Sequence, residues 1–170
     1  RCRTARPALC RADWRATDRA GTCGGYAGGA SAGAGLAAGL ALLARDRGEY
    51  SVAFQLLIYP MIDDRQITVS STWSDPIWSP SANTFGWTAY LGTKKGTADV
   101  EPYAAASRAT NLVGLPPTLI AVGALDGFSD EDIDYAVRLR HAAPAAVAGA
   151  QAHVGGEPAL LLRHAVMPVP

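Results

Sequence analysis

Two short and nearly continuous apolar runs stand out in the chain, at residues 52–59 and 118–123. Apolar runs of this length without polar alternation are typical of strands buried on both faces, as in a parallel sheet. The first run is closed by Pro60 and the second follows Pro117, and both prolines suit strand boundaries. We therefore expect two buried strands, separated by the looser segment 61–116.

Helical periodicity occupies the chain before and after these strands. Leu36, Leu40 and Leu43 recur at i, i+4 and i+7, which predicts a helix packed through these leucines and the alanines beside them. Gly48 follows as the expected C-cap. A further helix is predicted over 130–142, because acidic residues open it where the helix dipole favours negative charge. Helices that alternate with buried strands predict an α/β fold.

The pentapeptide Gly29-Ala30-Ser31-Ala32-Gly33 stands directly before the first helix. G-x-S-x-G is the pattern of a nucleophile elbow, in which a serine on a tight strand-to-helix turn exposes its hydroxyl. We expect glycine at both ends because side chains there would collide with the neighbouring strand and helix. Glycine and alanine are frequent in this chain, so the pentapeptide alone also fits a small-residue turn without chemistry.

Composition excludes several classes of function. The chain has 170 residues, of which 49% are hydrophobic, and a net charge of +0, so it can form a core and favours no charged partner. No phosphate loop, nucleic-acid patch or metal-ligand cluster is recognisable, and no apolar window suits a membrane span. We therefore expect no cofactor, no nucleic-acid partner and a cytoplasmic location. Cys2, Cys10 and Cys23 match no zinc pattern; we expect reduced cysteines, and the alternative is one disulfide with a spare thiol.

Composition also divides the chain into segments. Residues 1–25 are rich in arginine, lack an apolar period and are expected to form a poorly specified extension. Residues 26–142 carry the ordered patterns and form the expected core. Residues 143–170 are rich in alanine and proline, and we expect a tail there in place of a last strand. Strand propensity is low in this tail and again at 22–27, just before the pentapeptide.

Aromatic residues are scattered through the looser segment. Trp73, Trp78, Trp87 and Tyr90 lie among serine, threonine, proline and glycine. They could line an acyl pocket, but for most of them we expect packing of a loop-and-helix excursion against the core.

A series of short stretches in residues 26–142 follows the order of a known family. They are the pentapeptide 29–33, Leu42-Leu43-Ala44-Arg45-Asp46-Arg47-Gly48, Leu57-Ile58-Tyr59-Pro60-Met61, Pro102-Tyr103-Ala104-Ala105, Leu115-Pro116-Pro117-Thr118, Val122-Gly123-Ala124-Leu125-Asp126 and Asp130-Glu131-Asp132-Ile133-Asp134-Tyr135-Ala136. Through them, residues 26–142 resemble the C-terminal half of an α/β-hydrolase of the hormone-sensitive-lipase-like carboxylesterase family. The resemblance implies a partial α/β-hydrolase fold, with a mostly parallel sheet flanked by helices and without the early strands. It also implies a serine carboxylesterase that acts on small-molecule esters with short acyl chains.

The resemblance assigns the nucleophile to Ser31 and the triad acid to Asp126. The chemistry requires both, because a serine hydroxyl needs a histidine to accept its proton, and the histidine needs an acid to hold its tautomer. The backbone N–H of Ala32, the residue after the serine, is expected to donate to the oxyanion. An alternative for Asp126 is an aspartate that caps the next helix.

All the histidines follow Asp126, as the chain order of the family's triad requires. Family spacing would put the catalytic histidine near Gly156, and our prediction is His153, with His164 as the alternative. His141 lies within a predicted helix and is expected to be exposed.

The chain departs from the family at both ends of the resemblance. The family carries further oxyanion donors on a His-Gly-Gly-Gly type loop upstream of the serine, and this sequence contains no such motif. We expect reading-frame errors or an incomplete assembly to account for the abrupt ends near Gly25 and Ala142. The alternatives to an active esterase are a non-catalytic small-molecule-binding protein of the same fold and an inactive fragment. The oligomeric state stays open.

Overall fold

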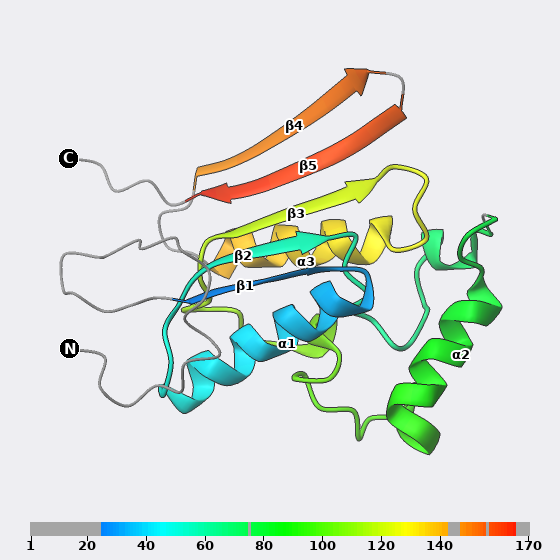
Figure 1. Ribbon diagram of the computed structural model, residues 1–170, viewed down its shortest axis with the longest axis horizontal. Coiled ribbons are helices and arrows are strands. Elements are labelled where there is room, and N and C mark those ends of the chain that lie inside the picture. Colours follow the sequence, from blue (N-terminus) through cyan, green and yellow to red (C-terminus); the bar gives the residue numbers. More distant parts are fainter. Residues whose placement is uncertain (1–24, 75, 143–146, 156, 166–170) are drawn as a thin grey trace.

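The computed structural model describes residues 25–74, 76–142, 147–155 and 157–165, with the last two ranges described by their backbone alone. The strands form one sheet in the order β1-β2-β3-β5-β4 (Figure 1). β1 (Gly25–Ala30), β2 (Val52–Ile58) and β3 (Thr118–Gly123) run parallel to one another. β5 (Glu157–Ala165) pairs antiparallel with β3, and β4 (Val147–Gly155) pairs antiparallel with β5.

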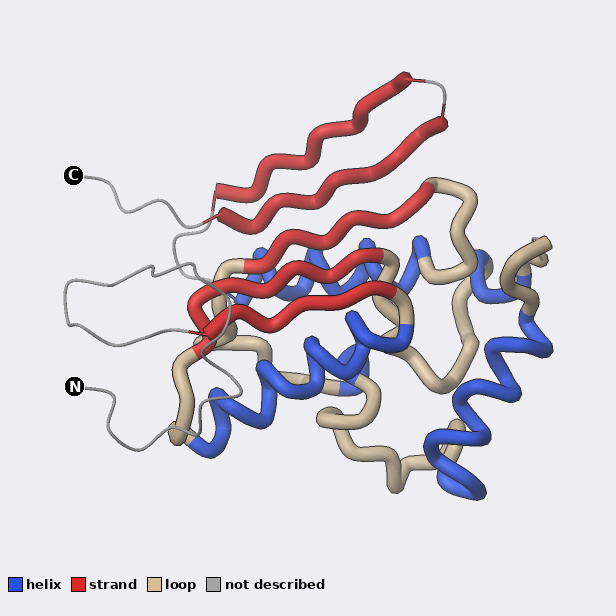
Figure 2. The backbone as a smooth tube through the Cα atoms, viewed as in Figure 1, coloured by secondary structure: helices blue, strands red, loops and turns tan. Residues whose placement is uncertain are grey.

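Two of the three α-helices among the described residues cover one face of this sheet. α1 (Ala32–Arg47) packs against β1 and β2, and α3 (Ser129–Ala142) packs against β3 and β5. α2 (Pro80–Leu91) lies beyond the carboxyl ends of the parallel strands (Figure 2). Short 3-10 turns complete the excursion between β2 and β3; they are η1 (Ser70–Thr72), η2 (Gly92–Lys94) and η3 (Ala106–Arg108).

The apolar runs and helical periods predicted their elements well. The runs at 52–59 and 118–123 form β2 and β3, and the two predicted helices are α1 and α3. α1 ends where expected, with Gly48 in the left-handed region at φ 64° and its N–H donated to the Ala44 carbonyl.

The expectation of poor strand formation at 22–27 is wrong for residues 25–27, and residues 22–24 lie outside the described residues. β1 pairs with β2 from Gly25 opposite Val52 to Ala30 opposite Ile58, with a register shift between Gly25 and Tyr26. The expectation of low strand content after residue 143 is also wrong for the backbone, because β4 and β5 form a ladder there. In both places pairing with a neighbouring strand outweighs weak intrinsic propensity.

The packing face of α1 is predicted correctly for the alanines Ala37, Ala41 and Ala44, which are buried, but not for the leucines beside them. Leu36 is 55% exposed and Leu40 is 54% exposed, whereas Leu42 is 1% exposed. The helix packs mainly through small residues, because the chain passes so close that a Cβ at Gly35 would meet the Met61 carbonyl. The other small residues of this buried face are Ala34, Ala37, Ala38, Gly39, Ala41 and Ala44.

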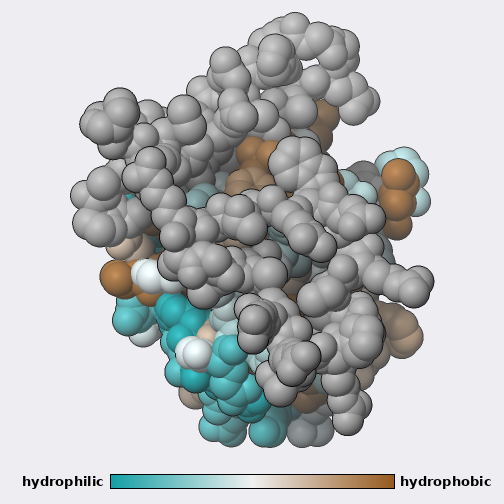
Figure 3. All heavy atoms as spheres, turned by 60° about the vertical axis from the view of Figure 1, so that its left-hand side comes forward, coloured by the Kyte–Doolittle hydropathy of each residue, from teal (hydrophilic) through white to brown (hydrophobic). Residues whose placement is uncertain are grey.

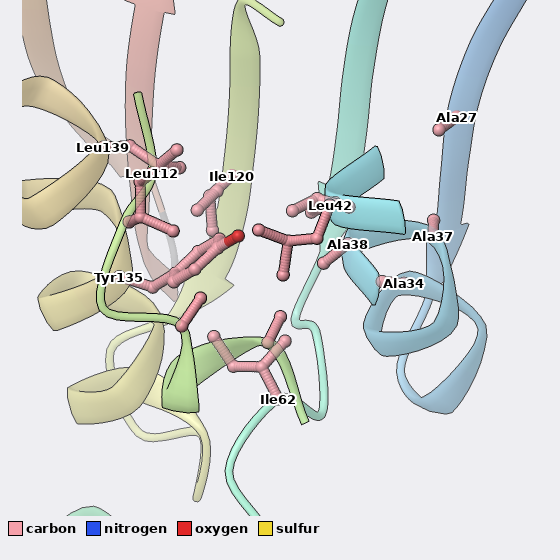
Figure 4. Packing of buried hydrophobic residues seen from close by; sticks show 13 residues of the cluster. Ala27, Ala34, Ala37, Ala38, Leu42, Ile62, Leu112, Ile120, Tyr135 and Leu139 are labelled. Carbon is pink, nitrogen blue, oxygen red and sulfur yellow. The ribbon is translucent and has the colours of Figure 1, made fainter. Parts of the chain in front are cut away.

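The main core lies between the sheet and the helices α1 and α3. Figure 4 shows Tyr135 and Leu139 of α3 facing Leu42 of α1, with Ile120 of β3 beside them. Along β3 the buried positions alternate with half-buried ones, so one face of the strand is packed more deeply than the other. Apolar residues also remain at the surface, where they are brown in Figure 3. Phe85 of α2, for example, is 76% exposed.

A smaller core forms between the excursion and the carboxyl ends of the strands. Met61, Trp87 and Phe128 are buried in it together, with Trp78 packed against them. The predicted packing role is therefore confirmed for Trp78 and Trp87. Trp73 and Tyr90 differ, since both are exposed by 40% or more.

Candidate active site

Ser31 occupies a strained turn between β1 and α1. Its φ is 53° and its ψ is −125°, a backbone conformation that costs a residue with a side chain roughly 1–3 kcal/mol. The surrounding hydrogen bonds hold it there. Its N–H donates to the Ile58 carbonyl at 3.0 Å, and its carbonyl accepts from the Gly35 N–H at 3.1 Å and the Met61 N–H at 3.2 Å. This is the local geometry expected of a nucleophile elbow.

The two glycines around Ser31 have different surroundings. A Cβ at Gly29 would lie 2.6 Å from the Gly33 carbonyl carbon and 2.9 Å from the Ala34 nitrogen. A Cβ at Gly33 would meet nothing within 4 Å. The expected steric need for glycine is thus confirmed at position 29, where the backbone of Gly33 and Ala34 would crowd a Cβ. It is wrong at position 33, where a Cβ has room.

Asp126 lies in a compact turn between β3 and α3. Its N–H donates to the Gly123 carbonyl at 3.1 Å, and its carbonyl accepts from the Ser129 N–H at 3.0 Å. Its carboxylate Oδ1 accepts from the Phe128 N–H at 2.9 Å. The side chain is half-buried. One carboxylate oxygen is therefore oriented by the backbone of the loop, as the helix-capping alternative also requires.

Ser31 and Asp126 lie at the same edge of the sheet. β1, β2 and β3 are parallel neighbours, with Ala30 opposite Ile58 and Ile58 opposite Ala121. Ser31 follows β1 directly, and Asp126 follows β3 in the next turn. Ligands and catalytic groups of open α/β sheets gather at the carboxyl ends of the strands.

The candidate histidines lie at different levels of the sheet. The side chains of His153 and His164 lie outside the described residues, but their backbones are on β4 and β5. Ala159 of β5 is opposite both Gly123 and His153, whereas His164 is opposite Thr118. Thr118 and Gly123 are the two ends of β3, about 16 Å apart at 3.3 Å per residue. The backbone of His153 is thus level with the carboxyl end of β3, and that of His164 with the opposite end. However, β4 is the edge strand farthest from β1, about 19 Å away across the sheet, so the described backbone does not bring His153 beside Ser31.

The remaining predicted residues occupy helix ends. His141 is exposed near the C-terminus of α3, as expected, about 18 Å along the helix axis from Ser129. Ala32 is the first residue of α1, where a backbone N–H has no acceptor within its own helix.

Glu131 is a buried residue that the sequence did not single out for this site. Its Oε1 accepts from the Ile62 N–H at 3.0 Å and from the Asp63 N–H at 3.1 Å. It thereby connects the helix that follows Asp126 to the segment whose Met61 N–H bonds the Ser31 carbonyl. Burial raises the pKa of Glu131 to about 8.

Asp132 is a second buried acid in the first turn of α3. Neither of its carboxylate oxygens has a hydrogen-bond partner among the described residues. Burial raises its pKa well above the ordinary value, and the charges of Glu131 and Asp126 raise it further. The part of the chain that the structure describes holds no group of acids, histidines or cysteines suited to a metal ion. No described helix is long and apolar enough to cross a membrane.

Comparison with known proteins identifies the fold. A family model described as the alpha/beta hydrolase fold matches residues 18–153, which is most of the chain. The chain belongs to the α/β-hydrolase fold family. The predicted partial α/β-hydrolase fold is thereby confirmed, with its parallel strands and its packed helices. No curated protein sequence matches the chain.

Several solved structures of esterases share this part of the α/β-hydrolase fold. A bacterial heroin esterase is 48% identical over 69% of this chain and 38% of its own, with a TM-score of 0.67. The esterase LipW from Mycobacterium marinum is 41% identical over 69% of this chain and 36% of its own, with a TM-score of 0.63. A thermostable esterase from Pseudomonas putida ECU1011 is 30% identical over 69% of this chain and 37% of its own, with a TM-score of 0.59. The chain thus spans less than half the length of these esterases.

Proposed function

We propose that this chain carries the nucleophile and acid of a serine carboxylesterase that hydrolyses short-chain acyl esters. The observation that carries the proposal is the strained backbone of Ser31, held at φ 53° between a parallel strand and a helix. Strain of this kind persists where the surrounding structure enforces it, and it is common at active sites. The similarity to solved esterases supports the same reaction class. We also propose residues 26–142 as the core portion of the hydrolase, with β4 and β5 adding to one edge of its sheet.

In the proposed reaction, Oγ of Ser31 attacks the carbonyl carbon of the ester while His153 accepts the hydroxyl proton. The oxyanion that forms on the substrate accepts a hydrogen bond from the Ala32 N–H. The tetrahedral intermediate then releases the alcohol, which takes the proton from the histidine. Water, activated by the same histidine, hydrolyses the acyl-enzyme and restores Ser31. Asp126 holds the histidine tautomer and stabilises the imidazolium throughout.

Hydrolysis of p-nitrophenyl butyrate by the full chain tests this function. Ser31→Ala should lower kcat by at least about 10³-fold, and Asp126→Asn by up to about 10⁴-fold, because triad members act as a unit. Ser51→Ala is the matched control, since Ser51 is exposed in the loop before β2. Equal turnover in the Ser31→Ala and Ser51→Ala variants would contradict the proposal.

The histidine assignment needs its own comparison. His153→Ala should abolish turnover while His164→Ala retains it, and equal activity in the two variants would refute the choice. Saturable binding of a small apolar ester without any hydrolysis would instead favour the non-catalytic binding protein.

A further inference from the structure

A buried serine in the excursion bonds directly to the loop that carries Asp126. Ser70 lies in η1 and is 0% exposed. Its hydroxyl donates to the Gly127 carbonyl at 3.0 Å and accepts from the Asp130 N–H at 3.1 Å. Its backbone N–H donates to the Asp130 Oδ2 at 2.8 Å. Three hydrogen bonds therefore join segments that are almost 60 residues apart in the sequence.

These bonds hold the chain on both sides of Phe128, in the segment that directly follows Asp126. Gly127 follows Asp126 directly, and Asp130 is in the first turn of α3. Between them, Phe128 is buried against Met61 and Trp87, and its N–H orients the Asp126 carboxylate at 2.9 Å. Because Ser70 fixes the residues before and after Phe128, it restricts the direction in which that N–H points. The position of the carboxylate thus depends on η1 as well as on β3.

We propose that Ser70 is a positioning residue for Asp126, acting through the Gly127 carbonyl and the Asp130 N–H. The inference rests on the proposed esterase function, in which Asp126 is the triad acid. Ser70 itself touches no reacting atom. Loss of its hydroxyl should let the loop drift, and a misplacement of about 1 Å can cost as much as about 10²-fold in rate. Since substrate binding does not use this loop in the proposed reaction, the loss should fall on kcat and leave KM unchanged.

The neighbouring Ser71 provides a matched control for Ser70→Ala. Ser71 is also buried, and its hydroxyl donates to the Thr68 carbonyl at 2.7 Å within its own turn. Ser71→Ala therefore removes the same group from the same 3-10 turn without touching the acid loop. Asp130→Ala serves as a second variant, because it removes the acceptor of the Ser70 N–H from the other side.

The experiment measures kcat and KM for p-nitrophenyl butyrate, together with hydrogen exchange of the amides at 127–130. Ser70→Ala should lower kcat by about 10-fold to 100-fold at unchanged KM and speed exchange in the loop, with Ser71→Ala matching the wild type in both. Asp130→Ala should act in the same direction. Equal kcat in the Ser70→Ala and Ser71→Ala variants would overturn the role of Ser70 and leave the esterase intact. An inactive wild type would overturn the esterase, and hydrogen exchange would then still decide whether Ser70 holds the loop.

Discussion

Crowding around Ser31 is confined to one side of the turn. Gly29 has no room for a Cβ because the backbone of residues 33 and 34 fills that space, whereas the space beside Gly33 is open. The backbone of the elbow cannot move without disturbing the bonds to Ile58 and Met61. The pentapeptide therefore contains one glycine that the turn requires sterically and one that it does not.

This difference predicts opposite outcomes for two alanine substitutions. Gly29→Ala should destabilise the chain by about 1–3 kcal/mol, as overpacking does. Gly33→Ala should be neutral or stabilise by up to about 1 kcal/mol, because Gly33 lies in the first turn of α1 and alanine is the better helix former. Urea unfolding of both variants measures the effect. A larger loss in Gly33→Ala than in Gly29→Ala would contradict the geometry.

Glu131 makes stability depend on pH. Its pKa is raised from 4.5 in the unfolded chain to about 8 in the folded chain by burial, so the folded state binds the extra proton between these values. The free energy of unfolding should therefore fall as the pH rises from about 4.5 to about 8. Asp132 is shifted in the same direction and adds to the slope.

Glu131→Gln should flatten this pH dependence. The Gln Oε1 can still accept from the N–H groups of Ile62 and Asp63, but the side chain cannot titrate. Urea unfolding at about pH 5 and about pH 8 should show a smaller difference than in the wild type. Asp134→Asn, on an exposed part of the same helix, is the control and should leave the difference unchanged. An unchanged slope in Glu131→Gln would remove Glu131 as its source.

Sequence reasoning singled out Ser31 and Asp126 as candidates because each belongs to a recognisable local pattern. Ser31 is bracketed by glycines, and Asp126 comes just after a buried apolar run. No local sequence pattern pointed to Ser70, since its hydrogen-bond partners Gly127 and Asp130 are 57 and 60 residues away in the sequence. Such a contact depends on how the excursion folds back, which no local period encodes.

α1 shows how an element can be predicted correctly while its buried face is not. The leucine period correctly indicated a helix, but the chain at Met61 and Tyr103 approaches Gly35 and Gly39 too closely for a side chain at those two positions. Small residues fill the contact instead, and Leu36 and Leu40 are turned outward. The hydrophobic period of a sequence indicates that a helix forms. The distance between that helix and the segments packed against it decides which side chains fit on its buried face.

Two leucines of α1 test this assignment. Leu42→Ala should cost about 2–5 kcal/mol of unfolding free energy, because Leu42 is 1% exposed in the main core. Leu40→Ala should change it by no more than about 0.5 kcal/mol, since Leu40 is 54% exposed. Thermal or urea unfolding of the pair gives the answer. A similar loss in both variants would restore the leucine face that the sequence period suggested.

β1 is an element that the sequence pattern did not predict but that the structure contains. Its sequence, Gly-Tyr-Ala-Gly-Gly-Ala, has little intrinsic strand preference, yet it pairs with β2 throughout. A Cβ at Gly28 would lie 2.9 Å from the Leu56 carbonyl oxygen, so the small residues suit a close approach. Long-range pairing decides the structure here, and single-sequence patterns carry little information on it.

At the scale of the whole molecule, the order of the parallel strands brings the candidate chemistry together. Ser31 follows β1, Asp126 follows β3, and β2 lies between those strands. The excursion packs against the same edge through Met61, Trp87 and Phe128. The chain spans only 36% to 38% of the length of the similar esterases.

The most direct test of the central claim is covalent labelling of the full chain by a fluorophosphonate probe. The probe reacts with a serine whose hydroxyl has been activated by a neighbouring base. We predict a single adduct, located by peptide mass spectrometry on Ser31, lost in Ser31→Ala and retained in Ser51→Ala. Absence of labelling, or labelling that persists in Ser31→Ala, would contradict the assignment of Ser31 as the nucleophile.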